Sequence, residues 1–282
     1  MKKIGYLGPM GTFAHEATLG YVRESLSVTQ DSDIELKPYP TKLDVLEAVD
    51  SKEIDQGVVP IENSIEGSVT ETLDGLSRFD DLVVTTELVL PISQNLMALP
   101  SATVEKLSEV WSHPQGIAQC RGWLHERHLA AVEFSSTAAA AKAVRDSGRS
   151  DVAAIANRAA ASVFGLNILK PDLEDEKENR TRFVVVLKDE KKLTISAKTM
   201  LLITPSKEES GVLAAMLNVL AALSLNLTWI ESRPTRRRLG TYQFFIDVES
   251  KDNSEILEKA ITILRTLGHQ VRVLGSYQSI AL

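Results

Sequence analysis

The sequence predicts an α/β protein of two units, and three features of the chain indicate it. Residues 1–190 alternate short apolar strands with amphipathic helices, a pattern typical of α/β folds with mostly parallel sheets. A run of strands over residues 82–99 interrupts that alternation, which predicts two lobes, the second over roughly residues 82–160. After the charged segment 188–192, residues 198–282 show the β-α-β-β-α-β order of a ferredoxin-like unit.

In the first unit, the apolar pattern predicts strands and helices in turn. A helix is expected over about residues 13–26, and a helical pattern follows each of the last three predicted strands. Thr41 and Asp44 have the spacing of a capping box, which predicts that another helix begins there. The predicted strands cover residues 4–7, 34–39, 57–60, 82–90, 96–99, 110–113, 132–134 and 152–156.

In the second unit, two helices are expected between four strands. The first helix covers residues 211–223 and has one apolar face. The second begins after Asn253, which is its predicted N-cap, and ends at Leu267 before Gly268. The predicted strands cover residues 199–204, 227–232, 242–248 and 271–277.

Composition excludes several classes of function. The formal net charge of −7 argues against nucleic acid as a partner. No apolar run approaches the roughly 20 residues of a membrane span, so no membrane partner is expected. Cys120 is the only cysteine, which excludes an intrachain disulfide and indicates a reducing, cytoplasmic location. The histidines show no metal-ligand spacing, and Gly8 and Gly11 do not form a nucleotide-binding loop, so no metal or cofactor is expected.

Small polar residues follow several predicted strands of the first unit, in the segments 8–12, 60–64, 112–115 and 135–137. In parallel α/β sheets such junctions gather at the carboxyl edge, where helix N-termini offer N–H groups to an anion. The segments together predict a cleft for a small anionic molecule between two lobes. Taken singly, Thr12, Ser64 and Thr137 are also compatible with ordinary helix N-caps.

The segment 178–183 leads directly into a buried strand and carries a hydroxyl beside a guanidinium. The two-residue period of a strand places Thr181 and Phe183 on one face and Arg182 on the other. A hydroxyl donor beside a fixed cation suits a carboxylate-bearing substrate that has an oxygen to lose. The same residues are also compatible with a plain strand start and a solvated arginine.

Taken in order, these motifs resemble those of the prephenate dehydratase family over the whole chain. The residues that carry the resemblance are 8–13, 60–64, 112–115, 136–138 and 179–183 in the first unit, and 211–213 and 230–234 in the second. The resemblance implies a catalytic unit over residues 1–190, with two lobes similar to periplasmic binding proteins, and an ACT regulatory domain over residues 198–282. No helical region precedes Ile4, so no fused chorismate mutase is expected in this chain.

The resemblance also implies the activity. The expected reaction is a lyase reaction without a cofactor, from prephenate to phenylpyruvate with loss of water and carbon dioxide, in L-phenylalanine biosynthesis. Thr181 is the expected catalytic residue, Arg182 would clamp a carboxylate or brace the loop, and Phe183 would pack under the site. The expected substrate-binding residues are Thr12, Asn63, Ser64, Gln115, Ser136 and Thr137.

Regulation by L-phenylalanine is implied as well, with a homodimer or homotetramer formed through the ACT domains. Val212 stands where relatives have alanine, which adds bulk beside the effector pocket. The alternatives are an arogenate dehydratase and a non-catalytic amino-acid sensor. The expected effector-binding residues are Gly211, Val212, Leu213, Asn226, Leu227, Glu231, Ser232 and Arg233.

Overall fold

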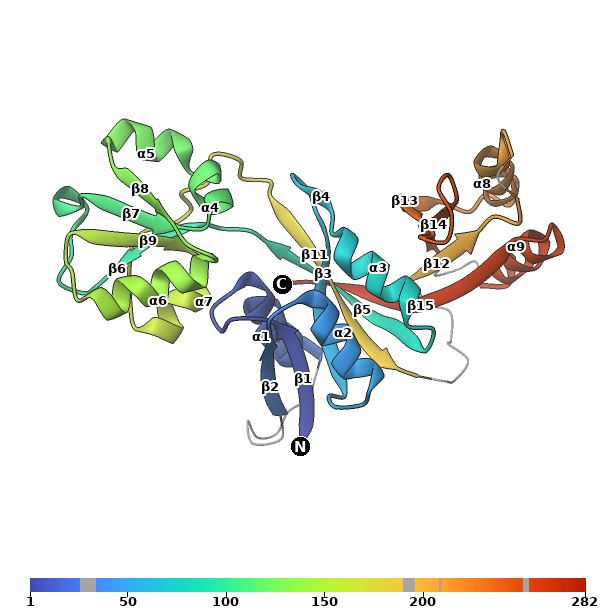
Figure 1. The fold of residues 1–282 in the computed structure, drawn as a ribbon, viewed down its shortest axis with the longest axis horizontal. Helices are drawn as coiled ribbons and strands as arrows, with labels where there is room; N and C mark the ends of the chain where they lie inside the picture. Colours follow the sequence, from blue (N-terminus) through green and yellow to red (C-terminus); the bar gives the residue numbers. More distant parts are fainter. Residues whose placement is uncertain (26–33, 190–195, 208, 251–253) are drawn as a thin grey trace.

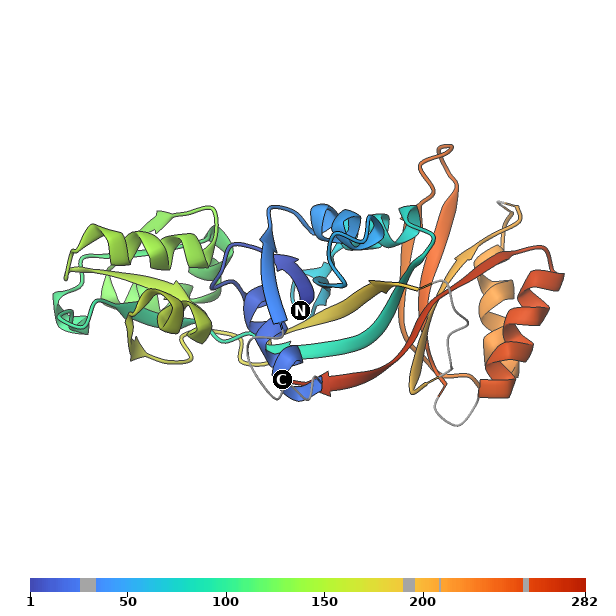
Figure 2. The ribbon, with the colours of Figure 1, turned by 90° about the horizontal axis from the view of Figure 1, so that it is seen from below.

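The computed structural model describes residues 1–25, 34–189, 196–207, 209–250 and 254–282, which form three bodies in a row (Figure 1, Figure 2). The first lobe lies in the middle, the second lobe at one end and the C-terminal unit at the other. A ten-stranded sheet is shared by the first lobe and the C-terminal unit, and a five-stranded sheet belongs to the second lobe. No helix among the described residues is long and apolar enough to cross a membrane.

The first lobe contains part of the ten-stranded sheet, in the order β2-β1-β3-β11-β5. Strand β1 is parallel to β2 and β3, whereas β11 is antiparallel to both of its neighbours, and β4 is a short antiparallel partner of β3. The strands are β1 (Lys2–Leu7), β2 (Ile34–Tyr39), β3 (Gln56–Asn63), β4 (Gly67–Ser68), β5 (Leu82–Pro91) and β11 (Arg180–Lys188), and the helices are α1 (Phe13–Ser25), α2 (Lys42–Asp50) and α3 (Thr70–Arg78).

The second lobe is built on the five-stranded sheet, in the order β10-β6-β9-β7-β8. Strands β7, β8 and β9 are parallel, and β6 is antiparallel to β9 and β10. The strands are β6 (Asn95–Ala98), β7 (Glu109–Ser112), β8 (Ala130–Glu133), β9 (Val152–Ala156) and β10 (Asn167–Lys170). The helices are α4 (Pro114–Gln119), α5 (Arg121–Arg127), α6 (Thr137–Ser147) and α7 (Arg158–Phe164), with the short 3₁₀ helix η2 (Val104–Lys106).

The C-terminal unit has the predicted β-α-β-β-α-β order, with antiparallel strands in the order β13-β14-β12-β15. Side chains of both helices pack with one face of this sheet in a single apolar core. The elements are β12 (Lys198–Thr204), α8 (Val212–Ala222), β13 (Leu227–Pro234), β14 (Tyr242–Glu249), α9 (Ser254–Thr266) and β15 (Gln270–Ala281). The predicted N-cap Asn253, the helix end at Leu26 and residues 190–192 of the charged segment lie outside the described residues.

Two expectations about the first unit are wrong. Its sheets are mixed rather than mostly parallel, because β5 leads from the first lobe to the second and β11 returns antiparallel between β3 and β5. Strand β5 (Leu82–Pro91) accordingly belongs to the first lobe, and the strands of the second lobe span residues 95–170 instead of 82–160. The apolar pattern also gave no indication of α3. The capping box is confirmed: the Thr41 hydroxyl accepts from the Asp44 N–H at 3.0 Å, and the Asp44 carboxylate accepts from the Thr41 N–H at 3.1 Å.

The C-terminal unit is packed onto the first lobe through a shared apolar core. Met200, Phe245 and Tyr277 of the C-terminal sheet belong to the same buried cluster as Leu73 of α3 and Val184 of β11. This face of the sheet lies opposite the one that holds α8 and α9. A core that spans both units fixes their relative position, because separating them exposes the buried side chains to water.

Strand β15 belongs to the C-terminal unit and extends into the sheet of the first lobe. Its first half pairs with β12, and its second half pairs in parallel with β5 of the first lobe, up to Ala281 opposite Val89. The crossing is closest at Gly275, where a Cβ atom would overlap the carbonyl oxygen of Val84. Glycine is required there because the two backbones approach too closely for any side chain.

We expect Gly275→Ala to lower the free energy of unfolding by about 2 kcal/mol or more, because the added methyl group forces the two strands apart. Urea-induced unfolding followed by circular dichroism measures the change. Gln278→Ala, at an exposed position later on β15, is the control and should stay close to the parent protein. Equal free energies of unfolding for the two variants would contradict the requirement for glycine at position 275.

Candidate active site

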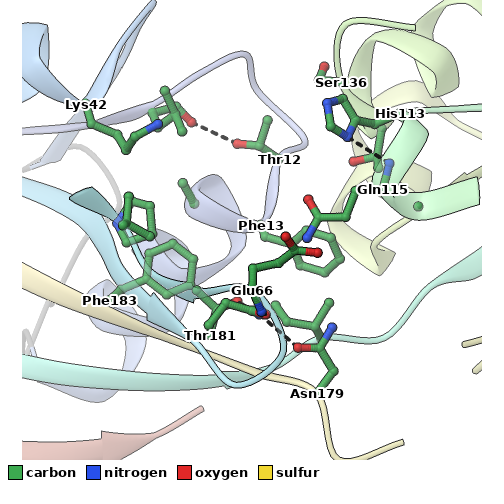
Figure 3. A pocket seen from close by; sticks show the side chains of 18 of the residues that line it. Thr12, Phe13, Lys42, Glu66, His113, Gln115, Ser136, Asn179, Thr181 and Phe183 are labelled. Carbon is green, nitrogen blue, oxygen red and sulfur yellow. Dashed lines mark hydrogen bonds between the residues drawn. The ribbon is translucent and has the colours of Figure 1, made fainter. Parts of the chain in front are cut away.

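A cleft of about 590 Å³ lies between the two lobes and is lined by loops from both (Figure 3). The first lobe contributes the loop between β1 and α1, the turn between β3 and α3, and the start of β11. The second lobe contributes the N-terminal ends of α4 and α6. The predicted polar junctions after the strands therefore meet at one place, although the sheets are mixed.

Thr181 lies on the floor of the cleft, at the start of β11, and is 9% exposed. Its backbone is held from both sides, since it lies opposite Asn63 of β3 and Leu90 of β5. The Thr181 hydroxyl oxygen accepts a hydrogen bond of 2.9 Å from the side-chain amide of Asn63. Since that bond uses a lone pair of the oxygen, the hydroxyl proton is left to point at a bound molecule.

Asn63 is fixed by several further hydrogen bonds. Its side-chain oxygen accepts from the backbone N–H groups of Ile65 and Glu66, at 3.0 and 2.9 Å. Its side-chain nitrogen also donates to the side-chain oxygen of Asn179 at 2.8 Å. Because the oxygen is committed to two N–H donors, the amide cannot rotate, and the nitrogen has to face Thr181.

Ser64 braces the loop and does not line the cleft. Its hydroxyl accepts from the Arg180 N–H at 2.9 Å, and its own N–H donates to the Arg180 carbonyl at 2.9 Å. These bonds tie the turn after β3 to the residue that precedes Thr181. The expected role of Ser64 in binding substrate therefore has no support from its position.

Thr12 lines the cleft within the glycine loop after β1. Its hydroxyl donates to the Leu7 carbonyl at 2.9 Å and accepts from the His15 N–H at 3.3 Å, so it also caps α1. His15 is buried, and its Nδ1 atom accepts from the N–H of Gly11 at 3.2 Å. Burial lowers the pKa of His15, which keeps the ring neutral and able to accept this bond.

The second lobe presents polar groups to the opposite side of the cleft (Figure 3). His113 caps α4 by accepting from the Gln115 N–H at 3.3 Å, and Ser136 caps α6 by accepting from the Ala139 N–H at 3.0 Å. Gln115, Ser136 and Thr137 all line the cleft. The first turn of α6 adds partial positive charge on this side, which favours an anionic group.

Phe183 lines the cleft and is buried, as expected for a residue that packs under the site. Arg182 does not line it, because the strand alternation turns its side chain to the other face of β11. There the guanidinium pairs with Glu87 of β5 and Asp247 of β14 and donates to the Tyr277 hydroxyl at 3.0 Å. This position supports the bracing role considered for Arg182 and not the clamping role.

The buried carboxylate of Glu87 stays charged in this cluster. Burial favours its neutral form, but Arg182 and Lys198 outweigh that effect and hold the pKa of Glu87 below its ordinary value. Lys198 donates to Glu87 at 2.9 Å. The cluster therefore joins strands of the first lobe and of the C-terminal unit through charged pairs that are shielded from water.

Several residues that line the cleft were not predicted as site residues, among them Lys42, Glu66 and Asn179. Asn179 is 2% exposed, and its side-chain nitrogen has no hydrogen-bond partner among the described residues. Its position two residues before Thr181 in the sequence could have indicated that Asn179 lies near the cleft. Lys42 follows the capping-box residue Thr41, but nothing in the local pattern indicates that it or Glu66 turns towards the cleft.

Most of the hydrogen-bond donors that line the cleft are neutral, and few of its side chains carry a positive charge. Lys42 is the one Lys or Arg that lines it within the described part of the chain, and it also pairs with Glu71 at 2.9 Å. The remaining donors are hydroxyls, amides and backbone N–H groups. No group of three or more His, Cys, Asp or Glu side chains in that part of the chain is arranged to hold a metal ion.

The expected effector-binding residues are spread over the C-terminal unit. Gly211, with a φ of 85°, is the N-cap of α8, and Val212 and Leu213 form its first turn. Asn226 and Leu227 follow the other end of that helix, which at about 1.5 Å per residue is roughly 16 Å away. Within one chain these groups therefore do not meet. Glu231, Ser232 and Arg233 lie on β13, where Glu231 and Arg233 face the first lobe and Ser232 is exposed.

Comparison with known proteins identifies relatives along the whole chain. The family model described as prephenate dehydratase matches residues 4–191. A prephenate dehydratase of Bacillus subtilis (strain 168) is 39% identical over an alignment of 290 positions, which covers 98% of this chain and 99% of the relative.

Solved structures of similar proteins cover the C-terminal unit as well. A prephenate dehydratase of Arthrobacter aurescens in complex with L-Phe is 32% identical with a TM-score of 0.84, over 98% of this chain and 89% of that chain. A protein described as a novel type of quorum quenching acylase is 26% identical with a TM-score of 0.85, over 99% of this chain and 98% of that chain.

We expect the stability of the protein to fall as the pH drops below about 6.5, the ordinary pKa of histidine. The unfolded chain then takes up a proton at His15, whereas the folded chain, with its lowered pKa, resists it until a lower pH. This contribution is complete above pH 6.5 and is lost as the pH falls through the pKa of the folded state.

Urea-induced unfolding at pH 7.5 and at pH 5.5 measures this effect. His15→Asn keeps an oxygen that can accept from Gly11 but cannot titrate, so its stability should fall less between the two pH values. Equal losses in the parent protein and in His15→Asn would show that His15 does not contribute.

Proposed function

Since the chain belongs to the prephenate dehydratase family, we propose that it converts prephenate to phenylpyruvate in L-phenylalanine biosynthesis. The observation that carries this proposal is the Thr181 hydroxyl, which Asn63 orients on the floor of a cleft between two lobes. Relatives named for this activity reach 39% identity, whereas the relative described as an acylase reaches 26%.

The reaction removes a ring hydroxyl and a ring carboxylate from the substrate. The carbon–carbon bond to the carboxylate breaks, its electron pair forms the new ring double bond, and the carbon–oxygen bond breaks on the other side of the ring. Carbon dioxide leaves, and the departing hydroxide becomes water by taking a proton that comes from the solvent. Formation of the aromatic ring supplies the driving force, so the protein has to position the substrate and help the oxygen to leave.

Thr181 is proposed to donate its hydrogen bond to the departing oxygen. A threonine hydroxyl is a weak acid, so it acts as an oriented donor and does not transfer its proton outright. A donor placed in this way contributes about 10²–10⁴-fold to the rate. Asn63 serves as its positioning residue, because its amide occupies the acceptor side of the Thr181 oxygen.

The two carboxylates of the substrate would be held by neutral donors of the cleft and by Lys42. Thr12 lies on the side of the first lobe, and Gln115, Ser136 and Thr137 lie on the side of the second. A molecule that contacts both sides holds the lobes together around it and excludes water from the reacting carbons.

For the C-terminal unit, we propose an ACT domain that binds L-phenylalanine and pairs with another copy, in a cytoplasmic homodimer or homotetramer. The β-α-β-β-α-β topology and the relative that was solved with L-Phe support this. The separation of Gly211 from Asn226 within one chain is compatible with an effector site that two copies complete.

The activity is tested by mixing the protein with prephenate and following the absorbance of phenylpyruvate, with arogenate in a parallel reaction. Thr181→Ala and Thr181→Val should lower kcat by about 10²–10⁴-fold, because both lack the donor. Thr181→Ser keeps the hydroxyl and should retain part of the rate. Circular dichroism and thermal unfolding check that each variant is folded. Turnover by Thr181→Val at the parent rate would remove Thr181 from the mechanism.

Titration calorimetry with L-phenylalanine tests the regulatory proposal. Binding should release or absorb heat and lower the activity, with a coupling of about 1–3 kcal/mol between effector and substrate. L-Alanine is the control ligand, since it lacks the ring. If L-phenylalanine produces neither heat nor inhibition, the C-terminal unit serves assembly alone.

A further inference from the structure

Strand β13 has two faces with different surroundings. Its side chains alternate between half-buried and exposed from Leu227 to Pro234. Trp229, Glu231 and Arg233 are on the half-buried face, whereas Thr228 and Ser232 are exposed. The half-buried face lies against the first lobe, where the Trp229 ring packs with the shared apolar core.

Glu231 and Arg233 are already bound to residues of the first lobe. The Ser68 hydroxyl donates to the Glu231 carboxylate at 2.7 Å. The Arg233 guanidinium donates twice to the Asp74 carboxylate of α3, with both distances 3.0 Å, and both side chains are 17% exposed. Such a paired arrangement fixes orientation as well as distance.

Ser68 belongs to the wall of the cleft. Residues 66–69 all line it, and α3 begins at Thr70, directly after them. At one end this wall is held by Asn63, whose side-chain oxygen accepts from the Glu66 N–H. Towards the other end it is held by Glu231 through Ser68 and by Arg233 through Asp74.

Besides these contacts, the wall is fixed by a short pairing with β3, in which Gly67 and Ser68 lie opposite Asn63 and Glu62, and by a hydrogen bond of 2.8 Å from the Val69 N–H to the Ile61 carbonyl. Strand β4 has only two residues, and residues 64–67 are exposed. Thr181, in contrast, is held by strands on both sides. A shift of β13 therefore changes the wall that contacts the substrate without displacing the hydroxyl that assists the reaction.

We propose that Glu231 and Arg233 are positioning residues for the substrate cleft, through which the C-terminal unit sets the place of residues 66–69. This inference rests on the proposed function. It assigns the two residues a role different from effector binding, since their charged groups are occupied by Ser68 and Asp74. Any ligand of the C-terminal unit that moves β13 would then act on substrate affinity.

Steady-state kinetics with prephenate tests the proposal. Glu231→Ala should raise KM by about three- to tenfold, the value of one hydrogen bond, while kcat stays within about twofold. Glu231→Gln keeps an oxygen acceptor and should restore most of the affinity. Arg233→Lys keeps the charge but loses the paired geometry, so it should also raise KM. Thr228→Ala, on the exposed face of the same strand, is the matched control and should leave KM unchanged.

A double-variant cycle shows whether the hydrogen bond between Ser68 and Glu231 is responsible for the change in KM. Ser68→Ala should raise KM as Glu231→Ala does, and the double variant should be little worse than either, because the two changes remove the same bond. Independent, additive effects would overturn the proposal. A KM for Glu231→Ala equal to that of the parent, in a folded protein, would overturn it as well.

Amide hydrogen exchange tests the contact without any turnover. Glu231→Ala should speed exchange in a peptide that covers residues 64–69, whereas Thr228→Ala should not. If the parent protein does not convert prephenate, the proposed function fails, and the exchange result still decides whether β13 holds the wall. Unchanged exchange in Glu231→Ala would overturn the positioning role whatever the substrate is.

Discussion

The buried charge cluster around Arg182 is the interaction on which the arrangement of the units depends. Arg182 stands next to Thr181 in sequence, yet it points away from the cleft to Glu87 and Asp247, two carboxylates that are at most 2% exposed. Removing one member of such a cluster leaves a charge buried without a partner, which costs about 3–5 kcal/mol. The partners come from β5 and β14, so the strand that carries the Thr181 hydroxyl is bound to both the first lobe and the C-terminal unit. A single strand thus lines the cleft on one face and attaches the C-terminal unit on the other.

Much of the fold could be predicted because it depends on local patterns. Most of the strands and helices, the capping box at Thr41 and the ferredoxin-like unit follow from residues close together in sequence, whereas α3 does not. Pairing could not be predicted in the same way. The antiparallel position of β11 between β3 and β5 joins residues about a hundred apart, and nothing in the local pattern of the three strands indicates which strand pairs with which.

In the candidate site, too, features that depend on local sequence could be predicted and features that depend on long-range contacts could not. Thr181, Gln115 and Thr137 could be found because each follows the end of a strand or opens a helix, and the structure gathers them in one cleft. The contacts of Ser64 and Glu231 could not be predicted, because the Ser64 hydroxyl bonds to a backbone 116 residues away and Ser68, the partner of Glu231, is 163 residues away. A motif identifies which residues are special. Whether such a residue touches a ligand or supports one that does is determined by three-dimensional contacts that the motif does not contain.

The pairing of β5 with β15 has a consequence for the order in which the chain can be completed during synthesis. Strand β5 ends at Pro91, but the strand that covers its outer edge extends to Ala281. At about 5–20 residues per second, a ribosome needs roughly ten to forty seconds to make the intervening chain. Throughout that time an emerging first lobe has an uncovered strand edge, which is the kind of surface on which nascent chains on one messenger associate with each other. By pairing with β5, the last strand of the C-terminal unit therefore also protects the first lobe from association through this strand edge.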